Sequence, residues 1–536
     1  MIQILNARIL TMKDRQTASC MCIEQGSIVY IGDHIPEEYK AADCVDMGGR
    51  VIIPGIIDAH SHLVSCANTF RQADVSSARS FADIQHILTD FIQQHHLKEQ
   101  DWVSGVGYDH TLLKERRHPD ADVLKAVGRR PIVITHASSH MGVASYTAMQ
   151  LANIPPDAPD PDGGRYGRNT DGMLNGYMEE NAFTSFLHHV PMPSMEEMMR
   201  LLEDALQLYA SYGITTIQDG MMNAAVYAMA VYAILKEAAA RNILKQDVVG
   251  YVGIRDSEAL RKESKPKGVQ YHKHFRIGGY KMFLDGSPQG RTAWMQTPYQ
   301  GDANYYGYGT MSDEEVAACI RKSLLEHQQL LAHCNGDAAA EQYLTQFEKV
   351  VRELDAKDTL RPVMIHAQLV QKEQLERMKP LQMIPSFFAA HVWHWGDVHI
   401  ENFGVQRASL ISPLRDALQL GLVFTLHTDT PVIAPNLMES VWCAAVRRTK
   451  NGVLLGEKER IDVYEALRAI TQYAAWQYHE EDQKGTLEAG KLADFAVLDQ
   501  NPLEIPVEEI RNIQVLETWK EGTCIYKRQV QESQNI

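Results

Sequence analysis

The chain has 536 residues, too many for one ordinary domain, so we expect two or three structural units. Hydrophobic residues make up 45% and charged residues 22% of the composition, which is typical of a globular protein and excludes an intrinsically disordered one. The formal net charge of -16 and the lack of a basic run would repel a phosphate backbone, which excludes nucleic acid as a partner.

The beginning of the chain shows no charged leader followed by an apolar stretch and a small-residue cleavage site, so no secretory signal is expected. The longest apolar stretch, residues 221–236, is shorter than the roughly 20 residues that a membrane span requires and predicts a buried helix. The eight cysteines include no CxxC pair, which predicts neither a disulfide framework nor a zinc ribbon. We therefore expect a cytoplasmic protein without a membrane partner.

Both ends of the chain show the alternation of apolar and polar residues, broken by glycine turns, that is typical of short strands. Residues 1–50 contain three such stretches, and residues 485–536 contain two more. We expect the two ends to pair into one composite β-sandwich domain that brings the termini together.

Residues 51–484 alternate short apolar strands with helical stretches, which is the pattern of a parallel α/β protein. Eight strands with intervening helices predict a (β/α)8 TIM barrel. The expected strands lie near residues 52–60, 214–218, 248–252, 277–283, 329–333, 362–366, 382–387 and 421–427.

One segment, residues 65–197, is too long for a single connection between a strand and the next helix. It contains strand-like stretches at 101–109 and 131–140 and a loop rich in proline, aspartate and glycine at 155–167. We interpret it as an insertion after the first barrel strand and expect it to cover the mouth of the barrel.

The strongest chemical signal is the pair His60 and His62 at the end of the apolar stretch IIPGIIDAHSH. Side chains two residues apart share one face of a strand, so both imidazoles can reach one ion. The carboxyl ends of the strands are also where TIM-barrel chemistry takes place. A satisfied core histidine pair is the alternative, but the position at the end of a barrel strand favours metal binding.

Later strands end in further ligand types: His333, His366 and Asp429. Each one alone could be a core or supporting residue, but together they form the imidazole and carboxylate set that zinc prefers. Lys281, on the fourth strand, cannot ligate a cation as an ammonium. It either pairs with Asp285 or a substrate group, or carries a carbamate that makes it an anionic oxygen ligand.

The order and spacing of these motifs resemble the amidohydrolase superfamily, within it the YtcJ-like group that includes N-substituted formamide deformylases and AepA-like proteins. The resemblance extends over residues 50–490, and residues 485–499 are similar to the closing β segment of the family. The matching stretches are VIIPGIIDAHSH, YKMFLDGSPQGRTA, LLAHCNGDAA, MIHAQLV and FTLHTDTPV.

The resemblance implies a metal centre of one or two divalent ions, with zinc the expected metal. His60, His62 and Asp429 would bind the first ion, and His333 and His366 would bind the second. A carbamylated Lys281 would bridge the two ions, and an unmodified Lys281 would imply a mononuclear centre.

The resemblance also implies hydrolysis of a C–N bond other than a peptide bond, in a small molecule such as an amide, formamide or cyclic amide. A divalent metal lowers the pKa of bound water and so supplies hydroxide near neutral pH. Asp429 is then the catalytic residue that takes the water proton and passes it to the leaving nitrogen.

Five residues are weaker candidates for substrate binding. Arg291 could hold a substrate carboxylate or form a loop ion pair. Trp393 and Trp395 could line an apolar pocket or pack within a loop. Glu180 and His140, in the insertion, match residues of the family pattern but could equally be solvated or packing residues. The role of His427, where the family more often has a small residue, stays open.

Two alternative functions remain at this point. A deaminase or an imidazolone-type hydrolase of a cyclic C–N bond would use the same barrel with a single metal. A regulatory protein without activity, as AepA-like relatives have been named, would not need Asp429 beside four histidines. The substrate stays undetermined, and so does the oligomeric state, with a homodimer among the states that the resemblance implies.

Overall fold

The computed structural model describes residues 1–529 apart from 40–42, 111, 138–140, 162–163, 223–224, 256–257, 259 and 261–269. The chain forms two compact units, one made of Met1–Val64 with Leu202–Ile536 and the other of Ser65–Leu201. Within the described ranges, no helix combines the length and the apolar character that a membrane crossing requires.

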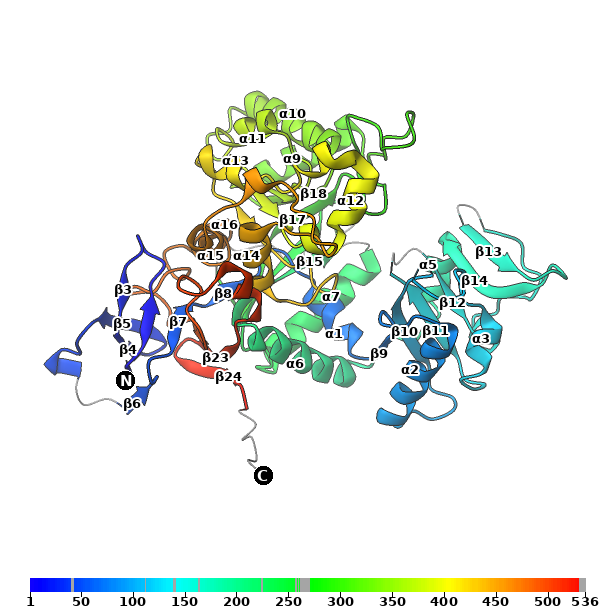
Figure 1. The fold of residues 1–536 in the computed structure, drawn as a ribbon, viewed down its shortest axis with the longest axis horizontal. Helices are drawn as coiled ribbons and strands as arrows, with labels where there is room; N and C mark the ends of the chain where they lie inside the picture. Colours follow the sequence, from blue (N-terminus) through cyan, green and yellow to red (C-terminus); the bar gives the residue numbers. More distant parts are fainter. Residues whose placement is uncertain are drawn as a thin grey trace. The chain divides into compact units, whose positions relative to one another are not determined.

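An eight-stranded parallel sheet forms the centre of the first unit (Figure 1). Strands that are consecutive in this sheet along the chain are also neighbours in it, as expected when each connection leads to the adjacent strand. The α/β class and the parallel sheet predicted from the sequence are thus confirmed. The strands are β8 (Ile56–Ile57), β15 (Ile214–Met222), β16 (Asp247–Gly253), β17 (Phe275–Phe283), β18 (Gln329–Cys334), β19 (Val363–His366), β20 (Ile384–Phe387) and β21 (Thr425–Leu426).

Amphipathic helices connect these strands. A capping box begins α9: the Ser312 side chain accepts from the amide of Glu315, and the Glu315 side chain accepts from the amide of Ser312. Both hydrogen bonds satisfy amide groups that have no partner within the helix. The helices of this unit are α6 (Met195–Ser211, which begins in the other unit), α7 (Ala225–Ala240), α9 (Asp313–Leu325), α10 (Asp337–Leu354), α11 (Lys372–Met378), α12 (His391–Ala408), α13 (Leu414–Gln419), α14 (Leu437–Val446), α15 (Val463–Ala469), α16 (Gln472–Gln477), and the 3-10 helices η1 (Glu37–Tyr39), η2 (Glu457–Glu459) and η3 (Val507–Asn512).

The first and last strands of the sheet meet at their carboxyl ends. The amide of His62 donates to the carbonyl of Thr430 (2.9 Å), and the amide of Asp429 donates to the carbonyl of His60 (3.0 Å). The backbone itself therefore holds these ligand candidates of β8 and β21 side by side.

The first predicted barrel strand, residues 52–60, is divided in the structure. Val51–Pro54 forms β7, which belongs to another sheet, and only Ile56–Ile57 forms β8. Proline lacks an amide proton for a sheet ladder, and Gly55 turns the chain where a Cβ atom would lie 2.3 Å from Oγ1 of Thr215. An apolar run that crosses from one sheet to the next therefore looks like a single strand in the sequence.

A six-stranded sheet combines both ends of the chain, with β7 and β22 as antiparallel neighbours, and a four-stranded sheet is formed by the amino-terminal end alone. Ile4, Ile52, Phe495 and Trp519 belong to one buried cluster that both ends share. The sheets have the orders β5-β4-β1-β6 and β24-β23-β22-β7-β2-β3, with β1 (Ile2–Leu5), β2 (Arg8–Leu10), β3 (Thr17–Ala18), β4 (Cys20–Glu24), β5 (Ser27–Gly32), β6 (Asp43–Asp46), β22 (Phe495–Leu498), β23 (Val515–Lys520) and β24 (Thr523–Lys527).

The second unit is built on a six-stranded sheet of its own, in the order β13-β14-β12-β11-β10-β9 (Figure 1). Three of its strands, β9 to β11, are parallel, and the others are antiparallel. Its elements are α1 (Leu63–Thr69, which begins in the first unit), β9 (Gln72–Asp74), α2 (Phe81–Gln94), β10 (Val103–Tyr108), α3 (Ala121–Lys125), β11 (Ile132–His136), β12 (Met141–Ala144), α4 (Tyr146–Leu151), β13 (Gly164–Arg168), β14 (Leu174–Glu180) and α5 (Asn181–Leu187).

Candidate metal centre

The ligand candidates of the barrel sheet lie at the carboxyl ends of its strands. Nε2 of His62 is 3.1 Å and Nε2 of His60 is 3.5 Å from Oδ1 of Asp429, and Nε2 of His366 is 3.9 Å from Oδ2. His60, His366 and Asp429 each offer a ligand atom within 4.8 Å of the others, which is close enough to hold one ion. The structure thus brings together side chains separated by more than 300 residues.

His333 and Lys281 complete this cluster. The ring centroids of His333 and His366 are 4.6 Å apart, and Nζ of Lys281 is 3.4 Å from Nε2 of His60. Nε2 of His333 lies 2.7 Å from Nδ2 of the Asn335 side-chain amide, which holds the ring in place beside His366. All six predicted metal ligands therefore converge.

Burial keeps His60, His333 and His366 neutral. It lowers the pKa of His333 to about 3 and holds the pKa of His60 and His366 well below the usual value, with nearby Lys281 acting in the same direction. A neutral imidazole retains the lone pair that coordinates a metal. The donor set is consequently in its ligating form at neutral pH, and it fits a divalent cation.

The orientation of His60 is fixed by Gln218. Nδ1 of His60 is hydrogen-bonded to the amide oxygen of Gln218, whose nitrogen donates to the carbonyl of Ala59 (2.8 Å). Because that oxygen only accepts, Nδ1 carries the proton and Nε2 faces Asp429 with its lone pair. Gln218 belongs to no sequence motif, and only its place on a predicted barrel strand could have indicated it.

A row of buried side chains orients His366. Its Nδ1 lies 3.2 Å from Nε2 of His427, whose Nδ1 lies 2.9 Å from Oγ of Ser386. Ser386 is hydrogen-bonded to Thr425 (2.8 Å), and the hydroxyl of Thr425 donates to the amide oxygen of Gln477 (2.8 Å). Because that oxygen can only accept, each proton in the row points away from His366. Nε2 of His366 keeps its lone pair, and His427 is the residue that positions it.

Asp429 is ionised and Lys281 is readily neutralised. Burial opposes the charge of Asp429, but its hydrogen bond with His62 and the charge of His62 outweigh burial and lower its pKa. Burial lowers the pKa of Lys281 to about 7, against the opposing effect of Asp429. A neutral amine is the form that reacts with carbon dioxide, so Lys281 has the chemistry that a carbamate requires.

Asp58 and Asp285 were not predicted as ligands, and each has a supporting position. Asp58 accepts from the hydroxyl and the amide of Thr428, while burial raises its pKa to about 7. Asp285 does not pair with Lys281 but accepts from the amides of Trp294, Asn335 and Gly336, at 2.7 to 3.1 Å. Both carboxyls brace the loops that follow ligand-bearing strands.

The predicted substrate residues have different surroundings. His140 lies outside the described residues, and Glu180 is exposed at the end of β14. The guanidinium of Arg291 lies 5.3 Å from the ring centroid of Tyr299. Trp393 packs on Trp442 with Arg511 over its ring, whereas Trp395 lies against Phe388, whose ring is 5.3 Å from that of His427.

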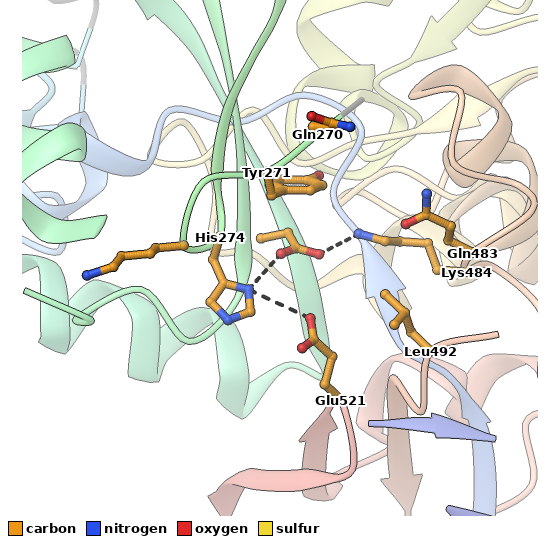
Figure 2. A pocket seen from close by; sticks show the side chains of 9 residues that line it. Gln270, Tyr271, His274, Gln483, Lys484, Leu492 and Glu521 are labelled. Carbon is orange, nitrogen blue, oxygen red and sulfur yellow. Dashed lines mark hydrogen bonds and ion pairs between the residues drawn. The ribbon is translucent and has the colours of Figure 1, made fainter. Parts of the chain in front are cut away.

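A cavity of about 480 Å³ lies at the opposite, amino ends of β16 and β17 (Figure 2). Nδ1 of His274 lies 2.8 Å from Asp247 and 3.9 Å from Glu521, and the ligand atoms of these three residues are also close enough for an ion. However, the ammonium groups of Lys484 and Lys520 lie 2.5 and 3.0 Å from one carboxylate oxygen of Asp247. Two cations already neutralise this carboxylate, so the cavity is lined by an ion network and not by a metal site.

The sequence model of the Amidohydrolase family matches residues 43–526. The N-substituted formamide deformylase of Arthrobacter pascens is 27% identical over 547 residues, which cover 98% of each chain. The protein named "Putative amidohydrolase YtcJ" of Bacillus subtilis (strain 168) is 24% identical, over 96% of this chain and 97% of that one.

Among solved structures, an uncharacterized metal-dependent hydrolase from Pyrococcus horikoshii OT3 is similar with a TM-score of 0.79. The likeness covers 94% of this chain and 99% of that chain at 24% sequence identity. At this identity, the likeness shows the fold.

Proposed function

The chain belongs to the Amidohydrolase family, and we propose that this hydrolase uses one or two divalent metals to cleave a non-peptide C–N bond of a small molecule. The substrate class is an amide, formamide or cyclic amide. The observation that carries the proposal is the convergence of His60, His62 and His366 on the carboxylate of Asp429, with the imidazoles of His60 and His366 kept neutral by burial. The relative named as an N-substituted formamide deformylase supports the formamide option.

In this proposal, His60, His62 and Asp429 hold the first ion, and His333 and His366 hold the second, with zinc the metal that suits these donors. A carbamate on Lys281 would bridge the two ions, and its lowered pKa favours that modification. When bound, a divalent cation lowers the pKa of water and polarises a carbonyl group.

The residues of the chain supply proton transfer and orientation. Asp429, ionised and only 14% exposed, takes the proton of the attacking water and returns it to the leaving nitrogen, which cannot depart as an amide anion. Gln218 and His427 hold His60 and His366 in their ligating tautomers. We propose Trp395 and Arg291 as substrate contacts, while Trp393, Glu180 and His140 stay predictions.

The finer architecture belongs to the same proposal. The two hydrogen bonds between the ends of β8 and β21 support a closed (β/α)8 barrel over residues 51–484. The shared core of the terminal strands supports a composite β-sandwich of residues 1–50 and 485–536.

A second candidate is a deaminase or imidazolone-type hydrolase with one metal. The close grouping of His60, His366 and Asp429, which is sufficient for a single ion, favours it. The two candidates differ in metal stoichiometry and in the need for Lys281.

The test is a screen of amides, formamides, cyclic amides and aminated heterocycles with the zinc-loaded full chain, together with metal analysis. We expect amide or formamide turnover with two zinc ions bound by the barrel, and K281M to lose one of them. Turnover of the heterocycles alone, with a single ion that K281M retains, would favour the second candidate. A chain that neither binds metal at the barrel nor turns over any of these compounds would refute both.

A further inference from the structure

The second unit carries a histidine and carboxylate cluster that the barrel chemistry does not use. The ligand atoms of Asp109, His110 and His136 all lie within 4.8 Å of one another. The geometry points to a metal site of its own in this unit, in which these three side chains bind a zinc-like divalent cation. This inference does not depend on the proposed function, because the three residues come from one sheet of residues 65–201.

The topology of the sheet brings the three residues together. β10 and β11 are parallel neighbours, and Tyr108, the last residue of β10, pairs with His136, the last residue of β11. Asp109 and His110 follow directly, so all three side chains lie at the carboxyl edge of two adjacent parallel strands. The ladder shifts by one residue after Val106, and Gly107 takes a positive φ of 93° there, which turns the end of β10.

The distances suit a tetrahedral ion. Nδ1 of His110 is 3.2 Å from Nε2 of His136, and Oδ1 of Asp109 is 4.0 and 3.9 Å from these two nitrogens. Ligands at about 2.0–2.2 Å from a tetrahedral zinc are about 3.3–3.6 Å apart. The distance between the two histidines is already close to this range, and the two distances to Asp109 need only a small contraction to match it.

The surroundings of His136 favour its neutral, coordinating form. Burial lowers the pKa of His136, an effect that Asp109 opposes and that His110 reinforces. The ring of His118 stacks on that of His110 at 3.9 Å and is itself held at both nitrogens by the hydroxyls of Tyr108 and Tyr177, at 3.2 and 3.4 Å. His118 is thus a support for His110 and not a fourth ligand.

The site has an accessible side. The side chains of Asp109 and His110 are each 31% exposed, whereas His136 is buried. A cation there would keep a coordination position for water or for an anionic group of a small molecule, as open three-ligand zinc sites do. A metal-free explanation also exists, since one imidazole proton shared by His110 and His136 would satisfy both rings, and the experiment must separate the two.

We would measure zinc bound per full-length chain after equilibrium dialysis against micromolar Zn²⁺, for the wild type, H110A and D109N. The matched control is H86A, which removes an exposed histidine that pairs with Asp90 (2.7 Å) in the same unit. We expect H110A to bind one zinc fewer than the wild type, D109N to bind that zinc at least about tenfold more weakly, and H86A to match the wild type. Equal zinc content and affinity in H110A, D109N and the wild type would overturn the site.

A barrel variant keeps this result separate from the proposed function. H60N/H62N/H333N/H366N removes the histidine ligands of both barrel ions and should still bind the zinc of the second unit, with a Co²⁺ absorption spectrum of a tetrahedral nitrogen and oxygen site. Adding H110A to that background should abolish this spectrum, and its persistence would refute the inference. Circular dichroism of each variant verifies folding, and D109N, which keeps both imidazoles, serves if H110A does not fold.

Discussion

Replacing His427 with leucine tests whether a buried hydrogen-bond row prepares the metal centre. Leucine has a similar size but no acceptor, so the proton on Nδ1 of His366 would lose its partner at 3.2 Å, and Oγ of Ser386 would lose its donor at 2.9 Å. An unsatisfied buried polar group costs about 1–3 kcal/mol. At about 1.4 kcal/mol for each factor of ten, His366 should bind zinc about 10- to 100-fold more weakly.

The assay is the zinc dissociation constant of the full chain, measured by competition with a chelator at neutral pH. H427Q is the matched control, because the side-chain oxygen of glutamine can accept from His366 where Nε2 of histidine does. We expect H427Q to recover most of the affinity that H427L loses. If H427L binds zinc as tightly as the wild type, or H427Q as weakly as H427L, the row does not orient His366 through its acceptor.

Three further predictions concern other parts of the chain. D429N should lower kcat by about 10²–10⁴-fold while most of the zinc is retained, because the proton carrier is lost but the histidines remain; kcat and zinc content measured on the same sample check this. G220A should reduce zinc affinity and thermal stability, since a Cβ atom there would lie 2.6 Å from Cε1 of His60, and unchanged values would show that His60 can move. E488Q should lower the free energy of unfolding by about 1 kcal/mol at pH 7 but not near pH 2, as urea titrations at both pH values can show.

The pKa of Glu488 explains why E488Q should lower the free energy of unfolding at pH 7 and not near pH 2. Burial raises this pKa, but hydrogen bonds from Lys13 and Thr486 and the charge of Lys491 outweigh burial and bring it to about 2. Because the folded-state pKa lies below that of the unfolded chain, the stabilisation is present above pH 4.5 and is lost as the pH falls toward 2. Partial exposure of the carboxylate limits its size.

The parallel strands and the family could be predicted because both depend on local patterns. Buried parallel strands are continuous apolar runs, and the pairs of β17 with β18 and β18 with β19 lie where those runs occur in the sequence. The family model that matches residues 43–526 confirms the membership indicated by the motifs. The division of residues 52–60 between β7 and β8 was missed, since apolar periodicity does not say which sheet a strand joins.

Supporting residues could not be predicted for a different reason. Gln218, Ser386 and Gln477 have no motif of their own, because their role depends on side chains more than 40 residues away in the chain. Asp109 and His136 lie in two stretches predicted as strands of the insertion, and His110 directly follows the first of them. Only the pairing of β10 with β11 brings these residues to one edge.

Two of the proposed metal ligands also have an unfavourable backbone conformation. His366 and Asp429 have φ values of 71° and 55°, in the left-handed region that costs a residue with a Cβ atom about 1–2 kcal/mol. Both residues stand where a buried strand ends and its ligand must turn toward the shared centre. The intrinsic backbone preferences of these residues disfavour such conformations. Burial likewise disfavours the charged form of Lys281. The surrounding sheet therefore holds the ligands against their own preferences, so a cation that binds them can offset part of this strain and stabilise the fold.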